Sequence, residues 1–320
     1  LAYGDVHPGG QTALIVGSEG QVLRYARSDH SVTDAGGDLE FGQISLTSVA
    51  WNSGGSWAYV GGTDGWLWRM RAAADGGAEV HPIQGRGSSD ITGMDCHPSV
   101  MACVVTSLVD GIGVIDRDHN LHWLGGVGHP WSDVVCPTTE SAICVAVSHD
   151  RTIATVTLDA ELAATSEVSL VQVTGTEGYF TGISRQSGDR SLIMVAPFSL
   201  IEHDLSLNSS YPWLENSDVV EYDAGVSNSR IVATWGTDRD SGWILTDRGE
   251  MVRYHPPLSN SLGGVLEVWV LIAIPAVIIL VILSFALGLS PGLQQRFTLR
   301  FGTAEEKRAA RREARRRKGR

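Results

Sequence analysis

Lysine is absent from residues 1–264, where 13 arginines face 32 acidic residues and give a net charge of −19. The chain also has no GxSxG, Walker or HExxH motif, and without lysine this region cannot hold an SxxK catalytic pair. These absences exclude the enzyme classes that the motifs define, and they favour a protein that is not an enzyme and uses no cofactor. Because so acidic a surface repels nucleic acid, we expect no nucleic-acid partner for this region.

Cysteine is scarce, and no CxxC pair or other set of ligands indicates a metal site. Cys96 and Cys136 each end an apolar run just before a turn that contains proline, and Cys103 and Cys144 follow the turn. Residues that flank a hairpin turn face each other with Cβ atoms about 4.5–5.5 Å apart, close to disulfide range. We therefore predict the disulfides Cys96–Cys103 and Cys136–Cys144. The alternatives are a Cys96–Cys136 bond or four free thiols.

One long hydrophobic segment, residues 265–289, has no charged residue from Val268 to Leu289. About 20 apolar residues in a helix span the roughly 30 Å hydrocarbon core of a bilayer, so the segment predicts a single transmembrane helix. Eleven of the 24 Lys and Arg residues follow Leu289, but only three of the 36 acidic residues do. Basic residues beside a span stay in the cytoplasm. We predict a single-pass protein of the cell membrane with its amino-terminal region outside and its tail inside.

Six copies of a sequence repeat precede this segment, and an export signal ahead of Leu1 is expected for them. Each copy has an apolar strand, a turn with Pro or Gly, a second apolar strand, a tight turn that is acidic in most copies, and a third strand. Gly20, Gly65 and Gly111 mark this second turn at intervals of 45 and 46 residues, a period typical of propeller blades. We predict an all-β, six-bladed propeller over residues 1–257, with seven blades as the alternative. The last blade has three strands or takes its outer strand from residues upstream of Leu1.

The first repeat contains VGSEGQVLRY and the second contains VGGTDGWLWR. With this VGxxGxVLRY pattern the repeats resemble divergent WD-repeat propellers, akin to photosystem II assembly-factor-like propellers. The WD dipeptide of standard WD repeats is missing. The resemblance covers residues 1 to about 257 and implies a rigid platform that binds other molecules.

Several residues outside the strands are candidate binding residues. Acidic side chains recur at the second turn, on one rim of the predicted propeller, where they would bind a cation or a basic ligand; the alternative is that each caps its own turn. Tryptophans in segments between repeats are predicted to be exposed contacts. Asn208 begins the NxS sequon Asn208-Ser209-Ser210, a predicted glycosylation site. The acidic candidates are Asp64, Asp110, Asp150 and Asp247, with Glu19 at the same turn, and the tryptophans are Trp123, Trp131 and Trp213.

Four regions follow from these patterns: an exterior propeller over 1–257, a linker over 258–264, a transmembrane helix over 265–289 and a basic cytoplasmic tail over 290–320. Thr303 and Glu306 have the spacing of a capping box before a basic helix, which we expect on anionic lipid of the inner leaflet. The predicted function is a membrane-anchored, extracytoplasmic platform that binds a protein or polysaccharide. The alternatives are a propeller enzyme of lyase or glycosidase type and a ligand-sensing receptor.

Overall fold

The computed structural model divides the chain into two compact units, Leu1–His255 and Pro256–Arg320, and each is considered by itself. It describes residues 3–36, 41–73, 78–137, 141–186, 188–216, 226, 228–236, 241–254, 274–275, 277–279 and 291–318.

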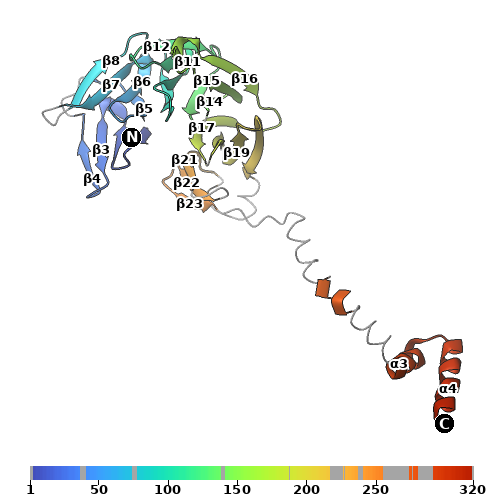
Figure 1. The fold of residues 1–320 in the computed structure, drawn as a ribbon. Helices are drawn as coiled ribbons and strands as arrows, with labels where there is room; N and C mark the ends of the chain where they lie inside the picture. The colour runs from blue at the N-terminus through green and yellow to red at the C-terminus, as the bar shows by residue number, and fades with distance from the viewer. Residues whose placement is uncertain are drawn as a thin grey trace. The chain divides into compact units, whose positions relative to one another are not determined.

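The described residues of the first unit form six antiparallel sheets, which follow one another around a common centre as the blades of a propeller (Figure 1). Within each sheet the strands are paired in chain order, and the first strands of neighbouring blades contact each other, so the first strand is the innermost. The predicted all-β, six-bladed propeller is therefore confirmed. The blades are numbered 1 to 6 along the chain.

The strands of each blade are given from the inside outwards. Blade 1 has β1 (Tyr3–Val6), β2 (Thr12–Val16), β3 (Val22–Ala26) and β4 (Ser31–Asp34), and blade 2 has β5 (Leu46–Trp51), β6 (Ala58–Gly62), β7 (Leu67–Ala72) and β8 (Ala78–Pro82). Blade 3 has β9 (Ile91–Cys96), β10 (Cys103–Ser107), β11 (Gly111–Ile115) and β12 (Leu121–Gly125), and blade 4 has β13 (Trp131–Val135), β14 (Ile143–Ser148), β15 (Thr152–Thr157) and β16 (Glu167–Gln172). Blade 5 has β17 (Tyr179–Arg185), β18 (Arg190–Ala196), β19 (Ser199–Asp204) and β20 (Ser209–Leu214), and the described part of blade 6 has β21 (Ile231–Gly236), β22 (Gly242–Thr246) and β23 (Met251–Tyr254).

The hydrophobic core lies between the blades. Middle strands such as β10, β11 and β14 are nearly continuous runs of buried residues rich in valine and isoleucine, so side chains on both of their faces meet neighbouring sheets. Between blades 2 and 3, for example, Tyr59 of β6 packs with Met94 of β9 and Val105 of β10, and all three are buried. The inner and middle strands are therefore apolar on both faces, because each face meets another sheet.

The acidic turns between the second and third strands have the backbone conformation that their sequences predict. In the turn after β2, Glu19 and Gly20 have φ angles of 58° and 70°, and Asp64 and Gly65 repeat this after β6 with 58° and 70°. Glycine adopts this left-handed region readily. At Gly65 a Cβ atom would also lie 2.3 Å from the carbonyl oxygen of Gly87, so no side chain fits there.

Both predicted disulfides are present. Cys96 lies directly opposite Cys103 in the β9–β10 hairpin, with Cα atoms 3.9 Å apart. Cys136 pairs with Cys144 across the β13–β14 hairpin, with Cα atoms 4.0 Å apart. Each bond closes a loop within one blade, as the spacing of the cysteines indicated.

The second unit contains two described helices, α3 (Pro291–Phe301) and α4 (Ala304–Lys318). The predicted capping box is formed: the backbone N–H of Thr303 donates to Oε2 of Glu306 at 2.8 Å, and the N–H of Glu306 donates to Oγ1 of Thr303 at 3.4 Å. The two helices are joined by a hydrogen bond from the Gln295 side chain to the carbonyl of Ala310.

The predicted transmembrane helix and linker lie mostly outside the described residues. The described positions of residues 265–289 are helical and exposed, and they are Ile274, Pro275, Val277, Ile278 and Ile279. Among the residues that the structure describes, no helix is both long and apolar enough to cross a membrane.

Candidate functional site

Three aspartates on inner strands join neighbouring blades. Asp5 accepts a hydrogen bond from the backbone N–H of Trp51 in blade 2 at 2.8 Å, and Asp95 accepts one from Cys136 in blade 4 at 2.7 Å. Asp133 accepts one from Ile183 in blade 5 at 3.2 Å. Each carboxylate therefore binds a strand of another blade through the main chain.

Two of these aspartates belong to a repeated Asp-x-His-Pro sequence, which begins at Asp5 and again at Asp95. The histidine of each copy also bonds to the following blade: Nε2 of His7 lies 3.0 Å from the carbonyl oxygen of Gly55, and Nε2 of His97 lies 2.7 Å from that of Ser141. A carbonyl oxygen only accepts, so Nε2 carries the proton in both rings. One four-residue sequence thus supplies two links between blades.

Asp133 occupies the space that two glycines leave. A Cβ atom on Gly93 of blade 3 would lie 2.5 Å from Oδ1 of Asp133, and one on Gly182 of blade 5 would lie 3.3 Å from Oδ2. Asp133 is 6% exposed, and the N–H groups of Val134 and Ile183 donate to its two oxygens. Hydrogen bonds of this kind are what allow a carboxyl group to be buried.

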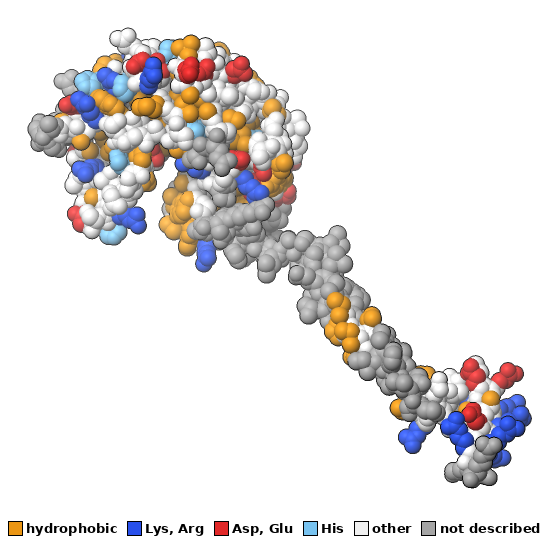
Figure 2. Space-filling model, viewed as in Figure 1, with side chains coloured by type: hydrophobic (Ala, Val, Ile, Leu, Met, Phe, Trp, Pro, Cys, Tyr) orange, Lys and Arg blue, Asp and Glu red, His pale blue; other side chains and the backbone are white. Residues whose placement is uncertain are grey.

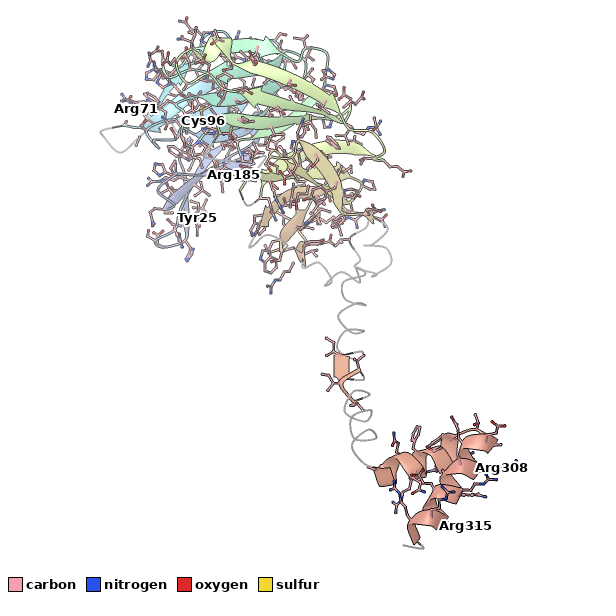
Figure 3. The ribbon with its side chains drawn as sticks, turned by 45° about the vertical axis from the view of Figure 1, so that its right-hand side comes forward. Tyr25, Arg71, Cys96, Arg185, Arg308 and Arg315 are labelled. Atoms are coloured by element: carbon pink, nitrogen blue, oxygen red, sulfur yellow. A yellow bond between two sulfur atoms is a disulfide. The ribbon has the colours of Figure 1, made fainter. Side chains whose placement is uncertain are left out.

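The same aspartates form an electrostatic cluster with Tyr3 and Arg185. Nη2 of Arg185 lies 3.1 Å from Oδ2 of Asp95, and Arg185 lies toward the middle of the propeller, whereas Arg71 and Tyr25 lie at its periphery (Figure 3). Burial raises the pKa of Asp5 to about 6 and that of Asp133 to about 7, and burial also raises the pKa of Asp95. The negative charge of Asp133, followed by burial, raises the pKa of Tyr3 well above its ordinary value. These carboxyl groups exchange protons closer to neutral pH than ordinary ones.

A second cluster lies on the surface around Trp57 of blade 2. The guanidinium carbons of Arg69 and Arg71 lie 4.7 and 4.6 Å from the centre of the Trp57 ring, within cation–π range. The rings of His119 and His81 lie 5.2 and 6.1 Å from it. Arginine and histidine side chains gather over β7 and β8 in Figure 2. We call these five residues the Trp57 cluster.

The charge of the Trp57 cluster comes mainly from its arginines. Arg71 forms an ion pair with Glu79 at 2.7 Å. Among the described residues no ion pair is found for Arg69. Burial, followed by the positive charge of Arg69, lowers the pKa of His119. At neutral pH the two guanidinium groups lie beside the carboxylate of Glu79, and the charges of Asp116 and Asp118 also act on His119. The region of the chain around them has a strongly negative net charge.

The carboxylates of three of the four predicted rim aspartates, Asp110, Asp150 and Asp247, accept hydrogen bonds from within the protein. Asp110 accepts from the backbone and hydroxyl of Ser88, and Asp150 accepts from His129. The N–H of Arg230 donates to Asp247, whereas at Asp64 it is the backbone N–H that donates, to the side chain of Asp90. Hydrogen bonds hold the pKa of Asp110 below its usual value and lower that of Asp150 to about 2, although burial opposes both shifts. Ligand binding by these four residues stays a prediction.

The predicted tryptophan contacts differ in exposure. Trp131 is fully buried, with its indole N–H donating to the carbonyl of Gly126, so the expectation that it is exposed is wrong. It is the first residue of β13 and not part of a connecting segment, and it packs between blades 3 and 4. Trp123 is half-buried and donates to the carbonyl of Gly85, and Trp213 packs on Tyr254 with ring centres 3.7 Å apart. Asn208 is exposed in the β19–β20 turn, and its glycosylation stays a prediction.

The comparisons with known proteins agree with the geometry on the fold alone. No family model and no curated protein matches the chain. Among solved structures, 1410 chains match, so the fold is too widely shared to indicate one function. One of them, the structure of U3-55K, has a TM-score of 0.62 and 11% sequence identity, and the match covers 80% of this chain and 77% of that one. At this identity the likeness shows a shared fold.

The raised pKa of Asp133 predicts that the protein loses stability as the pH rises from about 4 to 7. The folded state keeps the Asp133 proton up to about pH 7, whereas the unfolded chain releases it near its model value of 3.8, so the folded state binds more protons in this window. For one such group the free energy of unfolding falls by up to about 1.4 kcal/mol per pH unit.

Urea unfolding at several pH values tests this with Asp133→Asn, which stays neutral throughout. The wild-type protein should lose stability between pH 4 and 7 more steeply than the variant does. Parallel pH profiles for the two proteins would contradict the assignment.

Proposed function

We propose that this protein is a membrane-anchored, extracytoplasmic propeller that acts as a binding platform. The propeller fold supports a platform, because its strands hold surface side chains in fixed positions while most of its sheet edges are covered. The resemblance of the repeats to divergent WD-repeat and photosystem II assembly-factor-like propellers points the same way.

An exterior location for the propeller is supported by its cysteines. All four are paired in two disulfides, and disulfides persist in oxidising compartments and are rare in the cytosol. Residues 1–264 also differ from the basic tail in composition, since they have no lysine and a net charge of −19. This contrast suits two regions on opposite sides of a membrane.

Membrane attachment is supported by the exposed apolar side chains of the second unit. Ile274, Val277, Ile278 and Ile279 are helical and 51–58% exposed, a surface that water disfavours and lipid accepts. On α3, Leu293, Phe297 and Phe301 recur every four residues and are 49–68% exposed, so they share one helix face. The tail beyond Phe301 carries nine basic residues. This combination suits a helix that lies on an anionic inner leaflet.

The observation that carries the platform proposal is the Trp57 cluster. Two guanidinium groups next to an indole are suited to planar carboxylates, which arginine binds in a bidentate manner. The partner is therefore an acidic protein segment or an acidic polysaccharide. Because the propeller itself is acidic, it can bind an acidic partner only at a locally positive site. Arg69 and Arg71 supply that site.

The enzyme alternative is supported by one observation, the raised pKa values of Tyr3, Asp5 and Asp133. Carboxyl groups of raised pKa serve as general acids in glycosidases. Here, however, backbone N–H groups donate to both oxygens of Asp5 and of Asp133, which holds these carboxylates between strands. We favour the structural role.

A pull-down tests the Trp57 cluster in detergent-solubilised protein taken from its native membrane. The double variant Arg69→Ala/Arg71→Ala should retain at most about one tenth of the partner that the wild-type protein retains, a change of about 1.4 kcal/mol in binding free energy. The control Arg24→Ala/Arg27→Ala removes the same charge from exposed positions of blade 1 and should bind normally. Equal losses in both double variants, or none in either, would count against the site.

Protease accessibility tests the proposed topology. Protease added to intact cells or spheroplasts should remove the propeller and leave the tail, which an antibody against the last residues detects. Digestion of the tail with a protected propeller would place the two regions on the opposite sides.

A further inference from the structure

Five blade interfaces share one pattern. The residue at the middle of the second strand is buried against the preceding blade, where it joins a hydrophobic cluster with that blade's side chains. It pairs with a residue near the middle of the inner strand: Val60 with Val49, Val105 with Met94, Ala146 with Val134, Ile193 with Ile183 and Ile244 with Thr234. In blades 2 to 6 it is 0–2% exposed, and the residues are Val60, Val105, Ala146, Ile193 and Ile244.

Blade 1 has the same apolar face but nothing described packs on it. Ile15 is the equivalent residue, is only half-buried and belongs to no hydrophobic cluster of the described residues. Leu23, directly opposite Ile15 on β3, is also half-buried. Val6 and Val32 on the inner and outer strands are 59% and 56% exposed. The face of blade 1 that corresponds to the buried face of the other blades is therefore not covered by any described residue.

Blade 6 presents the complementary half. On the second strand of blades 1 to 4, the residue immediately before the equivalent position is buried against the following blade. Leu14, before Ile15, and Tyr59, before Val60, are examples. In blade 6 the corresponding Trp243 is half-buried and lies opposite Trp235, which is 39% exposed. Met251 is 59% exposed.

The two uncovered faces border one hollow. Figure 1 shows the blades as an arc with its opening between blade 1 and blade 6, and Figure 2 shows a hollow at this opening, with hydrophobic side chains gathered on its blade 6 side over β21–β23. The described residues form hydrophobic clusters at the five other blade boundaries and none at this one.

We propose that a seventh β-sheet, apolar on both faces and joined to the chain ahead of β1, fills this hollow. One face of such a sheet would cover Ile15 and Leu23, and the other would cover Trp235 and Trp243, which continues the interface that the other blades repeat. The direction of the chain agrees: at each boundary the outer strand of one blade leads into the inner strand of the next, and blade 1 begins with its inner strand β1. Both faces would then be buried as in the other blades.

Thiol labelling tests the proposal in the protein expressed from its complete gene and kept in its membrane. The four cysteines of residues 1–320 are in disulfides, and any further cysteine that the complete gene encodes is replaced by serine, so that an introduced cysteine is the only free thiol. Ile15→Cys, Val6→Cys and Trp243→Cys report on the two faces, and Arg24→Cys on β3 is the exposed control. Two reporters on blade 1 keep the test usable if one variant does not fold.

If a sheet covers both faces, the three reporter thiols should be labelled about a hundredfold more slowly than the thiol of Arg24→Cys, because a covered thiol reacts only after local opening. The double variant Ile15→Cys/Trp243→Cys should form no internal disulfide, because a sheet separates the two positions. Fast labelling of a folded reporter would overturn the proposal. An internal disulfide would show direct closure of blade 6 on blade 1, and a disulfide-linked dimer would show a second copy in the hollow; either result would also overturn it.

Discussion

The propeller depends on one constraint: an apolar sheet must be covered on both of its faces. A single blade of four short strands cannot achieve this, and neighbouring blades achieve it for one another. The constraint explains why Val60, Val105 and Ala146 recur at one position in successive blades, all of them fully buried. It also explains why the chain needs repeats of similar length, since each sheet must match the one before it.

The inner strands also depend on neighbouring blades, through buried aspartates that accept hydrogen bonds from them. Near the centre the blades approach so closely that glycine is needed at Gly93, and the carboxylate of Asp133 from the next blade fills the space beside it. Burial makes the charged form of this carboxylate costly, and the N–H groups of two blades partly offset that cost. Asp5 and Asp95 repeat this solution at two other boundaries. Links between blades and covered faces together make a rigid surface, which a binding platform requires.

Sequence-based prediction succeeded where the determinants are local. The three inner strands of the repeats and both disulfides follow from hairpin patterns within some 25 residues, and the number of blades follows from the period of 45 and 46 residues. The outer fourth strands were not among the strands described in the repeat. The exposure of Trp131 was predicted wrongly, because its burial depends on packing with blade 3 that no local pattern reveals. The bonds of Asp5 to Trp51 and of Asp95 to Cys136 join residues more than 40 positions apart. The repeated Asp-x-His-Pro sequence was the available indication of these links. The Trp57 cluster had no such indication, since it forms only when the residue before β6, the strands β7 and β8, and the turn at His119 come together.

The central claim, that close contact between neighbouring blades at the centre holds the molecule together, is tested most directly by urea unfolding of two glycine variants. In Gly93→Ala the new methyl group would lie 2.5 Å from Asp133 Oδ1, whereas in Gly125→Ala nothing lies within 4 Å of it. We predict that Gly93→Ala lowers the free energy of unfolding by about 1–3 kcal/mol, as overpacking does, and that Gly125→Ala changes it little. Equal stability of the two variants would contradict the account.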